Sequence, residues 1–163
     1  MTIEHIIKNE SNFRPFAINV NRLPNQSPPK INQPKSKQEA IEMASYYLSL
    51  GHSVDLGLMQ INTTNLKAYN VTLEVMFEPC QNIHVGSKIL HEGYQRALKI
   101  DSEPSQALQI ALSYYNTGSP TRGFHNGYVS KYVSTPPPVH ASSQVRQAPS
   151  TIRRRIIRLI PPA

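Results

Sequence analysis

The prolines of this 163-residue chain limit where helices can form. Four of the 14 prolines fall between Pro24 and Pro34, and six follow Ser134. Because proline lacks an amide hydrogen and clashes with the preceding helical turn, neither stretch can be one continuous helix. Regular structure is therefore expected before Pro24 and between about residues 35 and 133. A chain of this length supports one domain of ordinary size.

Apolar residues at helical spacing predict a mainly α, α+β domain. Ser36 and Glu39 form a capping box, which predicts a helix from Lys37 to Leu50 with Gly51 as its stop. Ser102 and Pro104 predict the start of another helix that ends at Gly118. Further helices are expected over 3–11, 63–69, 72–77 and 81–99.

Two stretches lack helical spacing. Residues 19–34 are rich in Pro, Asn and Ser, which predicts a small lobe of turns or a hairpin. Residues 134–163 combine a P-P-P run with Ser, Gln and Arg, which is typical of a disordered tail. The expected organisation is a domain over 1–133 and a flexible Pro/Arg-rich tail over 134–163. The first helix begins without a capping residue, so we expect the domain to be truncated at its N-terminus.

The net charge of +7 belongs mainly to the tail. Residues 1–133 hold 12 Lys and Arg against 10 Asp and Glu, whereas residues 134–163 hold five Arg and no acidic residue. A folded nucleic-acid interface would need basic residues along the patterned segments, with aromatic residues between them. A domain that binds nucleic acid is therefore not expected, although an adaptor that binds it through the tail remains an alternative.

Composition also argues against several other classes. Cys80 is alone, so this chain cannot form an internal disulfide, and no metal-ligand motif such as C-x-x-C or H-E-x-x-H occurs. No metal and no cofactor are predicted. No apolar run is long enough for a transmembrane segment, and the N-terminus lacks the order of a signal peptide.

Three short segments carry polar residues that point to chemistry. They are Glu10-Ser11, G-L-M-Q-I-N at 57–62, and S-Y-Y-N-T-G at 113–118. In this order and spacing they resemble the signature motifs of goose-type lysozymes and soluble lytic transglycosylases. The alanine of the family's A-Y-N motif is replaced by Tyr114.

Four further segments lie around these motifs: A-I-N-V-N at 17–21, G-H-S-V-D-L before the second motif, F-E-P-C-Q-N-I at 77–83 and G-F-H-N-G-Y at 123–128. They resemble one branch of that family, the transglycosylase component of bacterial type IV secretion systems. The resemblance implies a lysozyme-like fold with a catalytic cleft, a periplasmic location and peptidoglycan glycan strands as the substrate. It also suggests that the tail contacts secretion-system subunits.

The resemblance implies that Glu10 is the single catalytic acid/base. Glycosidic cleavage needs a carboxylic acid that protonates the leaving oxygen, and Glu10 follows an apolar helix face where desolvation favours the protonated form. Most glycosidases use a second carboxylate. In lytic transglycosylases the sugar's N-acetyl group and C6 hydroxyl take that part and leave a 1,6-anhydromuramoyl end.

Five residues are the expected substrate-binding groups. Gln60 can exchange hydrogen bonds with the saccharide and Met59 can provide an apolar wall. The Tyr115 hydroxyl can hydrogen-bond the Glu10 carboxyl, and Asn116 can anchor the cleft backbone or reach substrate. The full set is Ser11, Met59, Gln60, Tyr115 and Asn116.

Two other readings stay open at this point. A hydrolytic lysozyme would use a second carboxylate, and Asp55 is the obvious candidate. We expect Asp55 instead to cap or hydrogen-bond, because D-L-G is typical of the entry to a helical turn. A non-catalytic peptidoglycan-binding scaffold is the third possibility, which the intact Glu10, Gln60 and Tyr115 argue against.

Overall fold

The computed structural model describes residues 3–133 of the chain. Helices surround one small antiparallel sheet with the strand order β1-β2-β3, in which Ile18 pairs with Leu56 and Asp55 with Asn62. The expected mainly α class with a small lobe is confirmed. In chain order the elements are α1 (Ile3–Ser11), β1 (Ile18–Val20), α2 (Lys37–Ser49), β2 (Val54–Leu56), β3 (Ile61–Asn62), η1 (Thr63–Asn65), η2 (Val75–Phe77), α3 (Pro79–Ala97), α4 (Pro104–Thr117), α5 (Arg122–His125) and η3 (Val129–Lys131).

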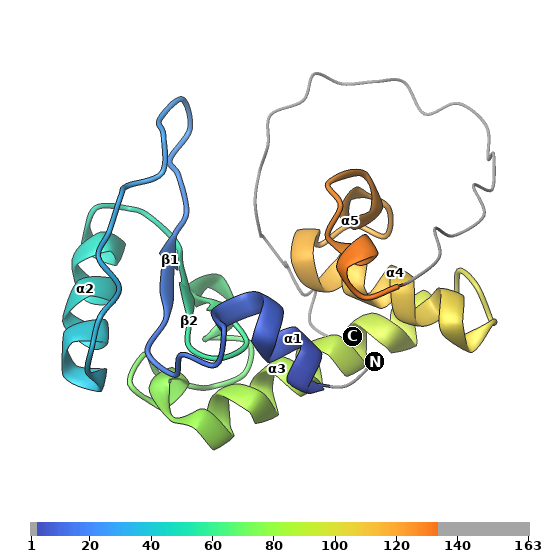
Figure 1. Ribbon diagram of the computed structural model, residues 1–163, viewed down its shortest axis with the longest axis horizontal. Coiled ribbons are helices and arrows are strands. Elements are labelled where there is room, and N and C mark those ends of the chain that lie inside the picture. The colour runs from blue at the N-terminus through green and yellow to red at the C-terminus, as the bar shows by residue number, and fades with distance from the viewer. Residues whose placement is uncertain (1–2, 134–163) are drawn as a thin grey trace.

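The sheet separates α2 from the other helices. Figure 1 shows α2 on one side of β1 and β2, with α1, α4 and α5 on the other side. The longest helix, α3, runs beneath the sheet and packs along α4. The core joins apolar residues from all these elements, including Ile6, Val54, Leu56, Met59, Met76, Phe77 and Leu112.

Local signals place α1 and α2 as expected. On α1, Ile6 and Ile7 are buried and Ile3 packs against the core. The Ser36 hydroxyl accepts a hydrogen bond from the Glu39 amide at the start of α2. The Glu39 carboxylate accepts from the amide of Lys35, one residue before the cap.

The expected helices over 63–69 and 72–77 are wrong in type. Each segment contains one 3₁₀ turn only, η1 and η2. Asn70 between them has a φ of +51°, a left-handed conformation that no helix continues through.

The boundaries of α3 and α4 differ slightly from the sequence prediction. Pro79 occupies the first turn of α3, so that helix begins two residues before Gln81. Glu103 caps α4 in place of Ser102, because its carboxylate accepts from the Gln106 amide. The left-handed Gly118 ends α4 as expected. The short elements α5 and η3 were not predicted, and the tail over 134–163 lies outside the described residues.

Asn82 of α3 ties the sheet to the helices. Its side chain is buried, its Oδ1 accepts from the Met59 amide at 2.7 Å, and its Nδ2 donates to the carbonyls of Leu56 at 2.9 Å and Met76 at 2.8 Å. Leu56 lies in β2, Met76 in η2 and Met59 in the turn after β2, so Asn82 links three segments through their buried backbone. These hydrogen bonds satisfy polar atoms in the interior, where water is excluded.

Replacement of Asn82 by Leu should destabilise the domain strongly. The leucine has a similar branched shape but a larger volume, and it removes three hydrogen bonds to buried backbone groups, which should lower the free energy of unfolding by about 3 kcal/mol or more. Urea unfolding followed by circular dichroism measures the loss. Gln81→Leu at the neighbouring exposed position is the control and should stay within about 0.5 kcal/mol. Equal stability of the two variants would contradict this account of Asn82.

Candidate active site

The turn between β2 and β3 carries the second sequence motif, G-L-M-Q at 57–60. Gly57 has a φ of +68° and Gln60 a φ of +52°. A Cβ atom on Gly57 would lie 2.5 Å from Nδ2 of Asn82 and 2.8 Å from the Met76 carbonyl oxygen, so only glycine fits there. The turn is fixed to the start of β1, since the Gly57 amide donates to the Ala17 carbonyl at 2.8 Å.

Gln60 and Met59 stabilise this turn from inside. The side-chain nitrogen Nε2 of Gln60 donates to the carbonyls of Ala17 at 3.0 Å and Gly57 at 2.9 Å. The Met59 side chain is fully buried and contacts α3, where a Cβ on Gly86 would come 2.5 Å from Met59 Sδ. Within the turn Gln60 and Met59 therefore have structural roles, and their expected contacts with a saccharide stay predictions.

Tyr115 connects the turn to α4. Its hydroxyl donates to the Met59 carbonyl at 2.7 Å, and its side chain is buried. A tyrosine hydroxyl has one hydrogen, so this bond is the one in which Tyr115 is the donor. The predicted hydrogen bond between Tyr115 and the Glu10 carboxyl stays a prediction, and the hydroxyl that donates to Glu10 in the structure belongs to another tyrosine.

Tyr128 donates to the Glu10 carboxyl. The distance from the Tyr128 hydroxyl to Glu10 Oε1 is 2.6 Å, across 118 residues of sequence. Glu10 lies in the last turn of α1 and is half-buried, whereas Tyr128 is 5% exposed. Burial and the Glu10 charge raise the pKa of Tyr128 well above its usual value, with smaller contributions from Tyr132 and Tyr115. Tyr128 therefore remains a protonated donor throughout the neutral range.

The C-terminal end of α4 positions the segment that carries Tyr128. Asn116 Oδ1 accepts from Asn126 Nδ2 at 2.8 Å, and Asn126 Oδ1 accepts from the Tyr128 amide at 3.0 Å. The Ser113 hydroxyl accepts from the Gly123 amide at 2.8 Å. A Cβ on Gly123 would lie 2.5 Å from Ser113 Cα, so α5 can approach α4 this closely only with glycine. The bond to Asn126 gives Asn116 an anchoring contact, and its expected contact with substrate stays a prediction.

Ser11 also has a structural position. It is buried, and its hydroxyl donates to the Ile7 carbonyl one turn earlier in α1. Its own carbonyl accepts from both the amide and the side-chain Nε of Arg14. Ser11 thereby fixes the direction in which the chain leaves the helix next to Glu10.

Asp55 is sealed inside the sheet. It is 0% exposed, and its two oxygens accept from Asn19 Nδ2 at 2.9 Å and from Asn62 Nδ2 at 2.8 Å. The expected hydrogen-bonding role is confirmed. The expected helical turn is wrong, because Asp55 pairs within β2 with both neighbouring strands.

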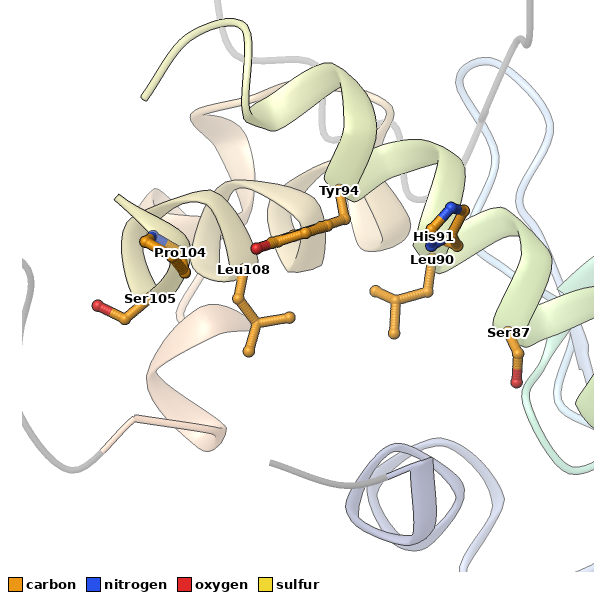
Figure 2. A pocket seen from close by; sticks show the side chains of 7 residues that line it. All are labelled: Ser87, Leu90, His91, Tyr94, Pro104, Ser105 and Leu108. Carbon is orange, nitrogen blue, oxygen red and sulfur yellow. The ribbon is translucent and has the colours of Figure 1, made fainter. Parts of the chain in front are cut away.

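A pocket of about 470 Å³ lies elsewhere, between α3 and α4. Figure 2 shows Leu90 and Tyr94 of α3 facing Leu108 of α4 across it. Its lining contains none of the motif residues Glu10, Gln60 or Tyr115. Residues 3–133 contain no group of three or more His, Cys, Asp or Glu that could hold a metal ion, and no helix of this part could span a bilayer.

Sequence reasoning missed Tyr128, Asn126 and Asn82. Tyr128 and Asn126 lie in the G-F-H-N-G-Y segment, and Asn82 lies in F-E-P-C-Q-N-I, so both segments were noticed only as resemblances. No local pattern indicates that these side chains bond to Glu10, Asn116 or the turn at 57–60. Tyr115 bonds to the Met59 carbonyl and Tyr128 bonds to Glu10, and Tyr115 adds to the raised pKa of Tyr128.

The sequence of this chain is similar to those of known proteins. Residues 1–132 match the family described as Transglycosylase SLT domain. The chain is 36% identical over 160 residues to the type IV secretion system protein virB1 of Brucella suis, covering 91% of this chain and 64% of that protein. It is 35% identical over 130 residues to protein virB1 of Agrobacterium fabrum, covering 80% of this chain and 51% of that protein. The chain thus spans between about half and just under two thirds of these relatives. No solved structure matches it significantly.

Tyr115→Phe should reveal the structural part of the Tyr115 hydroxyl. Removal of the hydroxyl leaves the buried Met59 carbonyl without this donor, which should cost about 1–3 kcal/mol in the free energy of unfolding. Chemical denaturation measures the cost. Tyr46→Phe, at a tyrosine 58% exposed on α2, is the matched control and should change little. A Tyr115→Phe variant as stable as the control would disprove the role of this hydrogen bond.

Proposed function

Because this chain belongs to the transglycosylase SLT domain family, we propose that it is a peptidoglycan lytic transglycosylase with Glu10 as its one acid/base. The observation that carries the proposal is the Glu10 carboxyl at the end of α1, half-buried and held at 2.6 Å by Tyr128. This arrangement holds one carboxyl group in a fixed orientation, as proton transfer to a bound glycan requires.

The proposed reaction uses Glu10 twice. The protonated carboxyl gives its proton to the oxygen that leaves when the β-1,4 bond between N-acetylmuramic acid and N-acetylglucosamine breaks. The positive charge that develops at C1 is stabilised by the sugar's own N-acetyl group. The Glu10 carboxylate then accepts the proton of the C6 hydroxyl while the C6 oxygen attacks C1. The product is a 1,6-anhydromuramoyl end, and Glu10 is again protonated.

The position of Asp55 supports a transglycosylase over a hydrolytic lysozyme. Inverting hydrolysis needs a carboxylate that activates water, and retaining hydrolysis needs one that attacks the sugar. Asp55, the only fully buried carboxylate among residues 3–133, has both oxygens bonded to asparagine side chains and no surface exposed to water. Mass spectrometry of muropeptides separates the two reactions, because only the transglycosylase leaves anhydromuramoyl ends.

The biological setting follows from the relatives. The Brucella suis relative is named a type IV secretion system protein, and both this relative and the one from Agrobacterium fabrum are named virB1. We therefore propose that this chain opens the cell wall locally, in the periplasm, for assembly of a secretion channel. A non-catalytic scaffold that binds glycan without cutting it is the alternative, and release of soluble muropeptides by the purified protein would exclude it.

Glu10→Gln should remove measurable lysis and leave the fold intact. The amide has nearly the same shape but cannot deliver a proton, and loss of a general acid typically costs about 10²–10⁴ in rate. Turbidity loss of a peptidoglycan suspension and release of muropeptides measure the effect. Glu4→Gln on the exposed face of α1 is the matched control and should behave like the parent. Parent-like lysis by Glu10→Gln would show that Glu10 is not the acid.

Removal of residues 134–163 should separate wall binding from catalysis. The five arginines of this segment have no acidic neighbours within it, so they attract anionic wall polymers or an acidic partner. Turnover of small soluble glycan fragments should stay nearly unchanged, whereas pelleting with intact sacculi should weaken, most at low ionic strength. A full-length variant with Arg153, Arg154, Arg155 and Arg158 changed to Gln tests the charge alone. A large drop in melting temperature on truncation would contradict the separation.

A further inference from the structure

The hydrogen bond from Tyr128 to Glu10 continues to a second tyrosine. The Tyr132 hydroxyl donates to the Tyr128 hydroxyl oxygen at 3.1 Å. The two rings lie 5.2 Å apart with a tilt of 51°, and they are linked by the short η3 turn. Tyr132 is partly exposed whereas Tyr128 is buried. The order of donation therefore runs from the partly exposed Tyr132 through the buried Tyr128 to the half-buried Glu10.

This order matters when Glu10 carries its proton. A protonated carboxyl has one O–H group, which can point toward the glycan or toward a nearby acceptor. The Tyr128 oxygen is such an acceptor, and a Glu10 proton directed there would be unproductive. Donation from Tyr132 occupies the Tyr128 oxygen and directs the single Tyr128 hydrogen to Glu10 Oε1. The carboxyl proton is then carried on Oε2.

We propose that Tyr132 is a positioning residue that acts through Tyr128 to keep the Glu10 proton in its transferable orientation. The inference rests on the proposed function of Glu10. Tyr132 need not touch the glycan, because its effect passes through one hydrogen bond. Lys131 also lies beside Tyr128, with its ammonium over the ring face at 5.6 Å from the ring centre.

Tyr132→Phe isolates the hydroxyl, because the phenylalanine keeps the ring that packs on Tyr128. We expect kcat on soluble glycan fragments to fall about fivefold, the size expected for loss of one neutral hydrogen bond. KM should stay within about twofold, since substrate contacts are unchanged. The melting temperature should also stay close to that of the parent. Tyr46→Phe removes an exposed tyrosine hydroxyl from α2 and serves as the control.

A double-mutant cycle with Tyr128→Phe tests the route of the effect. If Tyr132 acts through Tyr128, the double variant should have the kcat of Tyr128→Phe alone, because the oxygen that Tyr132 bonds is already gone. A purely structural hydroxyl would lower kcat by the same factor in both backgrounds, and that result overturns the proposal. If Tyr128→Phe is too slow to assay, the kcat and KM of Tyr132→Phe alone decide.

Two further outcomes separate this inference from the proposed function. A Tyr132→Phe variant with kcat within about twofold of the parent, or with the loss in KM, overturns the positioning role even when Glu10→Gln is inactive. A Glu10→Gln variant as active as the parent overturns the proposed function itself. The full 163-residue chain is used for every variant.

Discussion

The turn at 57–60 places irregular backbone in the interior, where each amide and carbonyl needs a partner. Two antiparallel strands of two or three residues cannot supply those partners. Asn82 of α3, Tyr115 of α4 and the side chain of Gln60 supply them instead. The G-L-M-Q segment is thus a junction where the sheet, α3 and α4 are held together. Its one polar side chain, that of Gln60, faces inward for that reason.

The same helix, α4, controls the other side of the site. Its last turn holds the following segment through Ser113 and Asn116, and that segment ends at Tyr128. Tyr115, on the same helix, bonds to the 57–60 turn. One rigid element therefore relates the turn that follows β2 to the tyrosine that orients Glu10. Precise placement of a catalytic group requires support of this kind.

The sequence allowed α1, α2, α3 and α4 to be predicted, because their signals are local. Apolar spacing, the Ser36 cap and the left-handed Gly118 act within a few residues of each other. The strand pairing escaped prediction, since strands of two or three residues show no periodicity. Turns or a hairpin were expected within 19–34, whereas β1 pairs with β2. Asp55 is held in β2 by asparagines of the neighbouring strands. The motif predicts Glu10 as the acid. Its partner Tyr128 could not, because a contact across 118 residues leaves no local pattern.

Asp55 and Glu10, the two carboxyl groups considered as catalytic groups, have opposite surroundings. Asp55 accepts from two amide nitrogens and lacks access to water, so its environment fixes it as an acceptor that joins three strands. Glu10 accepts from a hydroxyl and keeps part of its surface exposed, so it remains accessible to a ligand. The proposed reaction needs Glu10 to begin as a proton donor. A tyrosine hydroxyl orients the carboxyl without the positive charge that a lysine or arginine in that place would bring, and such a charge would favour the carboxylate over the acid.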